Sequence, residues 1–142
     1  MTAATSLLWP MLAHVGLVCV LYSWLTLARL RAVKRGEIDF ACFVLGREEP
    51  VAIARITRNL ANQFELPAIF YALVVLLVAL GRVTTVDLIA AWVFVAGRVI
   101  HTLVQTLTDN VPLRGQVFMI NFLAVMALAA HAALLAFEGI GR

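Results

Sequence analysis

Four long apolar runs, separated by polar segments, dominate the pattern of hydrophobic and polar positions along the chain. The first run, residues 7–28, contains no charged side chain. A helix of about 20 apolar residues is long enough to cross the hydrocarbon core of a bilayer. The pattern therefore predicts an all-α, integral membrane four-helix bundle, a single domain over residues 1–142, with helices over about residues 7–30, 51–80, 86–107 and 113–137.

The segments between the runs carry the residues expected of turns. The first connection is long and mixed in charge, and we expect it to hold a short helical piece; the other two are short. In the last connection, Asn110 is expected to cap the fourth helix, with Pro112 in its first turn. Pro67 lies inside the second helix, so we expect it to bend that helix and to free the backbone carbonyl of Gln63.

The composition agrees with a membrane protein. Of the 142 residues, 63% are hydrophobic and 13% are charged, whereas a soluble domain has about 45–50% apolar and about 25% charged residues. The net charge is +3, and seven of the eleven basic residues fall within residues 29–58. Basic residues in a loop beside a span orient a membrane protein, and this distribution is no nucleic-acid footprint. We therefore expect the first and third connections in the cytoplasm and both termini on the opposite side.

Other features of the sequence narrow the class further. Ten of the eleven basic residues are Arg, which suggests a GC-rich bacterial source and hence the inner membrane. The first run exceeds the about 7–15 residues of a signal-peptide core, so we expect it to be retained as a span. Cys19 and Cys42 fit neither a zinc motif nor a disulfide framework and are expected to be free thiols.

Four isolated polar residues in or beside the spans have simple explanations. His14 and His131 are expected to be packed, neutral side chains near the non-cytoplasmic ends of their helices. The alternative is that they face each other and bind haem or a metal ion, but no metal site is predicted. Asn121 is expected to make a hydrogen bond between helices, and Asp87 to be solvated at the end of the third helix.

Charged residues also interrupt the second and third runs. A charge at the bilayer centre costs about 2.5–3.5 kcal/mol on insertion scales, so such residues usually face the protein interior and mark function. Residues three or four positions apart share one face of a helix. Two sets have this spacing: Arg58, Asn62 and Glu65 in the second run, and Arg98, His101 and Gln105 in the third.

These two sets are expected to lie level in the membrane. The second and third helices form an antiparallel hairpin. The residue numbers of any two residues that lie at the same depth, one in each helix, therefore add up to the same value. Three pairs share the same total: Arg58 with Gln105, Asn62 with His101, and Glu65 with Arg98. We therefore expect two polar stripes side by side in the cytoplasmic half, with Glu65 paired to Arg98 within one chain or across subunits.

Arg114 adds a further positive charge near the cytoplasmic start of the fourth helix. A helix N-terminus beside an arginine attracts anions. With Arg58 and Arg98 against Glu65, the site has an excess of cations, which predicts an anionic ligand; a lipid headgroup is one possibility. The alternative is that the buried charges are structural and hold the helices together.

Two segments of this polar region resemble motifs of one family. Residues 58–67, RNLANQFELP, are similar to its Arg-x-x-x-Asn-x-x-Glu motif before a proline. Residues 98–102, RVIHT, and residues 112–114, PLR, are similar to its Arg-x-x-His-Thr and Pro-x-Arg motifs. On the basis of these motifs, the chain resembles the MAPEG family, the membrane-associated proteins in eicosanoid and glutathione metabolism. The resemblance covers nearly the whole chain. It is to a bacterial-type member that is similar to the microsomal glutathione transferases.

The resemblance implies a homotrimer of four-helix subunits that binds glutathione, as a co-substrate, between neighbouring subunits on the cytoplasmic side. It implies that Arg114 is the catalytic residue that stabilises the thiolate, and that a lipophilic small molecule or lipid enters from the bilayer. Carried over position by position, the glutathione ligands would be Arg58, Asn62, Glu65, Arg98, His101 and Gln105, with Arg29 or Arg31 of the adjacent subunit.

The sequence departs from the family pattern at two positions on the thiol side. Gln105 stands where many members have a tyrosine, and Gly115 stands where some have a serine. The resemblance therefore predicts a glutathione-dependent membrane transferase or peroxidase acting on lipophilic electrophiles. The alternative, which the two missing hydroxyls favour, is a non-catalytic accessory or lipid-binding subunit of a membrane complex.

Overall fold

The computed structural model describes residues 3–43 and 49–140, and every regular element in these residues is helical. Residues 44–48 of the predicted basic loop, including Arg47, lie outside the described residues. The element η1 is the short helical piece expected in this loop. The elements in chain order are α1 (Ala3–Lys34), η1 (Phe40–Phe43), α2 (Val51–Ala61), η2 (Asn62–Phe64), α3 (Leu66–Ala79), α4 (Thr85–Leu107) and α5 (Val111–Ile140).

The described residues contain four segments that are long and apolar enough to cross a membrane. The second segment combines α2, η2 and α3. Large apolar side chains on the outer faces are exposed in the single chain, with Val51 at 70% and Phe137 at 73%. Such surfaces are covered by lipid or by another subunit in a membrane protein, so the predicted all-α membrane bundle is confirmed. The segments are Thr5–Lys34, Val51–Ala79, Thr85–Leu107 and Val111–Gly139.

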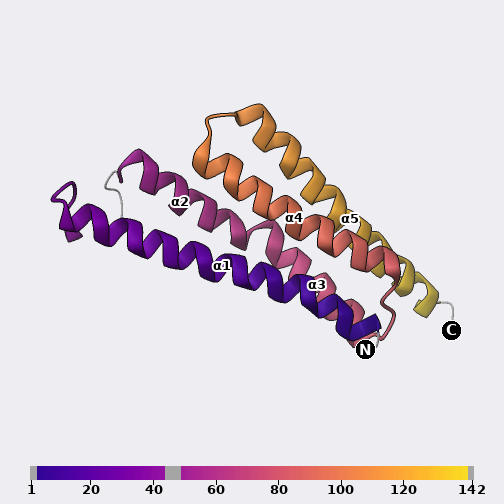
Figure 1. Ribbon diagram of the computed structural model, residues 1–142. Helices are drawn as coiled ribbons and strands as arrows, with labels where there is room; N and C mark the ends of the chain where they lie inside the picture. Colours follow the sequence, from indigo (N-terminus) through magenta and orange to yellow (C-terminus); the bar gives the residue numbers. More distant parts are fainter. Residues whose placement is uncertain (1–2, 44–48, 141–142) are drawn as a thin grey trace.

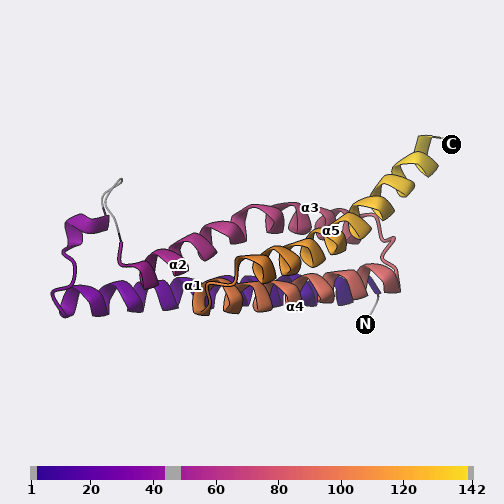
Figure 2. The same ribbon diagram turned by 90° about the horizontal axis from the view of Figure 1, so that it is seen from above.

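The helices alternate in direction along the bundle (Figure 1). The first turns of α1 and the last turns of α5 lie at the same end as the connection between α3 and α4. Figure 2 shows α1 and α4 along one side, α2 and α3 arching over them, and α5 crossing obliquely until its last turns leave the bundle. This arrangement gives α4 neighbours in α1, α2 and α5, and α4 therefore carries the largest share of buried polar residues.

Two apolar clusters and a polar layer between them make up the interior. The terminal cluster lies near the chain ends and includes Phe70 and Phe94, whose rings stack with centroids 4.2 Å apart. The loop cluster lies toward the α1–α2 connection and includes Leu21 and Ile56. The polar layer separates the two clusters and consists of His14, Asn59, Gln63, Arg98 and Thr102, all buried.

The second span is broken in the middle, as the proline predicted. α2 ends at Ala61, η2 follows, and Glu65 has φ −89° and ψ −97° before α3 resumes with Pro67 in its first turn. A proline cannot donate the backbone hydrogen bond that a continuous helix requires. The freed carbonyl that a side chain uses is that of Asn62, one residue before the expected Gln63 carbonyl.

The start of α4 corrects one expectation. Asp87 is 1% exposed rather than solvated. Its carboxylate accepts hydrogen bonds from the backbone N–H and the hydroxyl of Thr84, both at 2.7 Å, in a capping box. His131 of α5 binds the same carboxylate at 2.9 Å. The free N–H groups of a helix start need acceptors, so this buried aspartate both caps α4 and fastens α5 to it.

The two membrane-embedded histidines have separate partners. His14 contacts Tyr71 and Gln63, and His131 contacts Asp87, so each is packed against its own neighbours. In the part of the chain that the structure describes, no group of three or more His, Cys, Asp or Glu side chains could hold a metal ion. The capping role expected of Asn110 is confirmed, because its side-chain oxygen accepts from the backbone N–H of Leu113 at 2.9 Å.

Helices α4 and α5 approach each other closely at Gly97. A Cβ atom at this position would lie 1.9 Å from Oδ1 of Asn121, so any larger residue requires the Asn121 side chain to move. Asn121 is fully buried, yet both of its side-chain polar atoms lack a partner among the described residues. The expected hydrogen bond between helices is therefore not made, and Asn121 acts here through its shape against Gly97.

Candidate functional site

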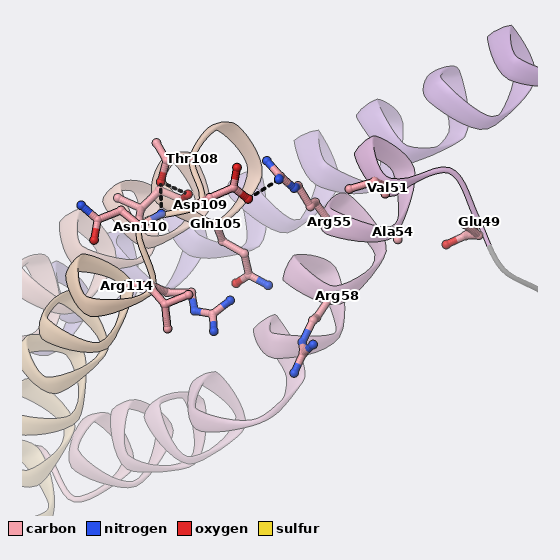
Figure 3. Close-up of a pocket in the computed structure, with 12 residues that line it drawn as sticks. Glu49, Val51, Ala54, Arg55, Arg58, Gln105, Thr108, Asp109, Asn110 and Arg114 are labelled. Atoms are coloured by element: carbon pink, nitrogen blue, oxygen red, sulfur yellow. Dashed lines mark hydrogen bonds and ion pairs between the residues drawn. The ribbon is translucent and has the colours of Figure 1, made fainter.

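Two cavities open between α2, α4 and the start of α5. The loop-side cavity has a volume of about 500 Å³ and lies beside the α4–α5 connection (Figure 3). The inner cavity has a volume of about 260 Å³ and lies deeper along the spans. Arg58 and Arg114 line both cavities and mark the place where they meet. The inner cavity is lined by Arg58, Asn62, Glu65, Leu66, Arg98, His101, Arg114, Gly115 and Phe118.

The loop-side cavity is bounded by charged and polar groups from three elements. Arg55 of α2 forms an ion pair with Asp109 of the α4–α5 connection, which ties α2 to this turn. In Figure 3, the side chains of Arg58, Gln105 and Arg114 converge on the space between the helices. Gln105 belongs to α4 and is 5% exposed, so it forms the floor of this cavity.

The two polar stripes lie side by side, but Asn62 bonds Gln105 rather than meeting its expected partner His101. The side-chain amide of Asn62 donates to Oε1 of Gln105 at 3.0 Å, which joins the two helices at the level of the cavities. One turn of α4 further into the membrane, His101 lines the inner cavity. The structure therefore brings six of the predicted residues to one cavity, namely Arg58, Asn62, Glu65, Arg98, His101 and Arg114.

The predicted ion pair between Glu65 and Arg98 is not made within the chain. Arg98 donates from Nε and from one terminal nitrogen to Oε1 of Gln63, at 3.0 and 2.9 Å, and from that nitrogen to the carbonyl of Asn62 at 2.7 Å. Glu65 stands at the break in the span, where it is exposed and makes no hydrogen bond or ion pair with Arg98, so its charge acts on Arg98 only at longer range. The helix break explains the difference, because equal depth predicts a pair only where both helices are continuous at these residues.

Three ionised groups of the site remain uncompensated. Among residues 3–43 and 49–140, none makes a hydrogen bond or ion pair with the guanidinium groups of Arg58 and Arg114 or with the carboxylate of Glu65. Elsewhere in the described chain most arginines have a carboxylate partner, as Arg55 and Arg82 do. Charged groups left unpaired beside a cavity are available to a ligand of complementary charge.

Two further polar atoms around the cavities lack partners. They are Nδ1 of His101 and Nε2 of Gln105, and both residues are at least nine-tenths buried. A buried polar atom without a hydrogen bond costs about 1–3 kcal/mol. A ligand that reaches these atoms recovers this free energy, so they add hydrogen-bonding capacity to the cationic wall.

Arg29 and Arg31 lie outside both cavities of their own chain. Arg29 donates to Glu49 from Nε at 2.8 Å and also contacts the hydroxyl of Thr57, which holds the end of α1 against α2. Arg31 is exposed near the end of α1. Their predicted place in the site of an adjacent subunit stays a prediction.

The polar layer around Arg98 was missed by the sequence reasoning. Gln63 and Asn59 are four residues apart, and Arg98 and Thr102 are also four residues apart. Asn59 and Gln63 therefore share a helical face that is rotated by one residue from the predicted stripe of the second span. Arg98, in contrast, belongs to the predicted stripe of the third span, and Thr102 follows His101. The amide of Asn59 donates to Thr102 at 3.2 Å, which joins the two faces. The four-residue spacing of these polar side chains is visible in the sequence. It is less conspicuous than the predicted stripe because neither Asn59 nor Gln63 of the second span is charged.

The fold and the cavities define a class, that of four-span membrane proteins with an arginine-lined cavity between the helices. The sequence profile of the MAPEG family matches residues 7–134. The chain therefore belongs to the MAPEG family, and it is a multi-pass membrane protein of the glutathione and eicosanoid metabolism type. No curated protein and no solved structure gives a significant match to the chain.

Proposed function

We propose that the protein is a glutathione-dependent membrane transferase or peroxidase that acts on lipophilic electrophiles. The observation that carries this proposal is the set of uncompensated charges, Arg58, Arg114 and Glu65, around one cavity in a member of this family. Glutathione has two carboxylates, one ammonium group and a thiol. Both signs of charge in the site would thus have a partner on this peptide.

The balance of charge around the inner cavity supports this ligand. Three guanidinium groups and one carboxylate line it, which leaves two positive charges in excess. Glutathione with an ionised thiol carries two negative charges in excess. Arg58 and Arg98 would bind the carboxylates, Glu65 the ammonium group and Asn62 the peptide backbone. Arg–carboxylate pairs are among the stronger hydrogen-bonded contacts in proteins.

Arg114 would act on the thiol. A free thiol has a pKa of about 8.5, and a nearby cation lowers this value, so more of the nucleophilic thiolate is present at neutral pH. In conjugation, the thiolate sulfur forms a bond to an electrophilic carbon, whose leaving group departs with the electron pair. In peroxide reduction, the thiolate attacks the O–O bond, and a second glutathione completes a disulfide while the peroxide becomes an alcohol and water.

The setting of the reaction is part of the proposal. We place the protein in a bacterial inner membrane, with the α1–α2 and α4–α5 connections in the cytoplasm. The exposed apolar faces of the spans fit a homotrimer in which Arg29 or Arg31 of one subunit reaches the glutathione of the next. The lipophilic substrate would arrive between helices from the bilayer.

The test is calorimetric titration of the detergent-purified protein with glutathione. Glu65→Ala should abolish saturable binding, because the ammonium group then loses its carboxylate. The matched control is Glu138→Ala, whose carboxylate binds Arg82 at the opposite end of the bundle at 3.0 Å and should not affect affinity. Absence of binding at millimolar glutathione would contradict the proposal. Saturable binding would justify a screen of electrophiles and peroxides as second substrates.

One observation favours a second candidate, a non-catalytic accessory or lipid-binding subunit. None of the residues that line the inner cavity carries a hydroxyl group, so the thiol has no hydroxyl donor there. The carbonyl of Gln105 is already engaged by Asn62. Arg114→Ala separates the two candidates. It should abolish turnover in an enzyme, and it should leave assembly with a partner complex intact in an accessory subunit.

A further inference from the structure

Arg98 is a buried cation whose hydrogen-bonding partners are neutral. The residue is 1% exposed, and its hydrogen bonds go to the side-chain oxygen of Gln63 and to the carbonyl of Asn62. A buried charge is normally paired with an opposite charge, because desolvation is otherwise costly. Here, within the described residues, no carboxylate makes a hydrogen bond or ion pair with Arg98, and Glu65 acts on it only from a longer distance. No direct contact therefore neutralises its positive charge.

The break in the second span supplies part of the compensation. The carbonyl of Asn62 lies at the C-terminal end of α2, where the helix macrodipole is negative. Interrupted helices in membrane proteins use such freed carbonyls and half-helix ends to bind ions. The break thus directs a negative dipole end at Arg98 without adding a negative charge to the cavity.

Gln63 is itself fixed from three sides. Its Oε1 lies 3.1 Å from Nε2 of His14, and a carbonyl oxygen can only accept, so Nε2 of His14 carries the hydrogen. The other ring nitrogen of His14 lies 2.6 Å from the hydroxyl of Tyr71. The Nε2 of Gln63 donates to the carbonyl and to Oδ1 of Asn59, both at 3.3 Å. These partners exclude the flipped amide, which would turn its N–H groups toward Arg98.

We propose that Gln63 is a positioning residue that holds Arg98 as an uncompensated cation at the wall of the inner cavity, and that His14 fixes Gln63 for this task. The neutral amide is the essential feature. A carboxylate at the same place would hold Arg98 equally well but would cancel its charge. The identity of the anion rests on the proposed function, whereas the preserved charge does not.

The experiment compares two anions on the purified protein by calorimetry at fixed ionic strength. Sulfate reports the cationic site itself, and glutathione reports the proposed function. Gln63→Glu retains the acceptor for Arg98 and adds an ion pair, which offsets the loss of the N–H groups that Asn59 accepts, so the protein should stay folded, as its thermal midpoint without ligand would show. Both anions should nevertheless bind about tenfold more weakly or worse, because a charge-assisted contact is lost. Gln116→Glu adds the same charge on α5 outside both cavities and should bind like the wild type.

The outcomes separate the two proposals. If Gln63→Glu binds both anions like the wild type, or if the wild type binds neither, the inference is overturned. Sulfate binding that depends on Gln63, without any glutathione binding, upholds the inference and overturns the proposed function. Glutathione binding that is lost in Glu65→Ala and unchanged in Gln63→Glu does the reverse.

The role of His14 has its own test with a conservative rescue. His14→Leu removes the N–H that holds Gln63, so sulfate and glutathione should both bind several-fold more weakly. His14→Gln offers an amide N–H at this position and should recover much of the affinity. A His14→Leu protein that binds both anions like the wild type would overturn the assignment of His14.

Discussion

Charged side chains are paired at the terminal end of the bundle and unpaired around the inner cavity. At the terminal end, Asp87 is bonded to Thr84 and His131, and Arg82 is paired with Glu138 at 3.0 Å. Around the inner cavity, Arg58, Arg114 and Glu65 have no partner in the described chain. Charges paired within the chain are already satisfied, whereas unpaired charges at a cavity remain open to a ligand. The contrast supports the proposed ligand site at the cavity and a structural role for the charges at the far end.

The largest expected effect tests the cavity side of this contrast. Arg114→Ala should lower turnover of glutathione with a lipophilic electrophile by about a hundredfold or more, as loss of one electrostatic stabiliser does in other enzymes. Steady-state kinetics on the purified protein give the measurement, with Arg82→Ala as the matched arginine control. Equal losses in both variants would contradict the distinction between the two ends.

The next effect concerns the packing between α4 and α5. Gly97→Ala should lower the free energy of unfolding by about 1–3 kcal/mol, because the new methyl group collides with Asn121. Thermal unfolding in detergent gives the measurement, and the double variant Gly97→Ala with Asn121→Gly should recover most of the loss. An unchanged midpoint in the single variant would show that Asn121 moves aside freely.

A smaller effect is expected at the cap of α4. Asp87→Ala should destabilise the protein by about 0.5–2 kcal/mol, because Thr84 and His131 both lose an acceptor. Glutathione affinity should not change, since Asp87 lies far from both cavities. Calorimetry and thermal unfolding on one preparation check both statements, and a loss of affinity would mean that the ends of the bundle are coupled.

The smallest effect is expected for the exposed ion pair at the terminal end. Arg82→Ala should alter stability by no more than about 1 kcal/mol, because surface ion pairs contribute little. Raising the salt concentration should reduce even this difference. A larger loss would indicate that Arg82 has a further partner in the assembled protein.

The sequence predicted the fold and much of the site, because the signals involved are strong. Long uncharged runs in a 142-residue chain leave few alternatives to membrane spans, and Pro67 in such a run predicts a break. Charged residues within apolar spans are rare, so the sequence alone identifies Arg58, Glu65 and Arg98 as candidate site residues. These signals depend on residue type and spacing, which a single sequence contains.

The remaining features depend on geometry that spacing does not determine. The partner of Arg98 is Gln63 rather than Glu65. The helix break at Glu65 changes the rotation of Glu65 about the helix axis relative to Gln63. Asp87 is buried because α5 brings His131 against it, a contact between distant segments. Asn121 lies against Gly97 of α4 and has no hydrogen-bond partner among the described residues, which depends on how α4 and α5 pack. Sequence spacing describes a single helix, whereas each of these results involves two.

The polar layer also sets the vertical and rotational positions of the helices that contribute to it. Lipid tails are as apolar as leucine, so apolar contacts alone discriminate poorly between one vertical or rotational setting of a membrane helix and the next. Sliding or turning α1, α2 or α4 would break the hydrogen bonds that join His14, Gln63, Asn59, Arg98 and Thr102. Among the described residues, α5 contributes no hydrogen bond to this layer. The helix that carries Arg114 is aligned instead by the contact of His131 with Asp87 and by the close approach of Asn121 to Gly97.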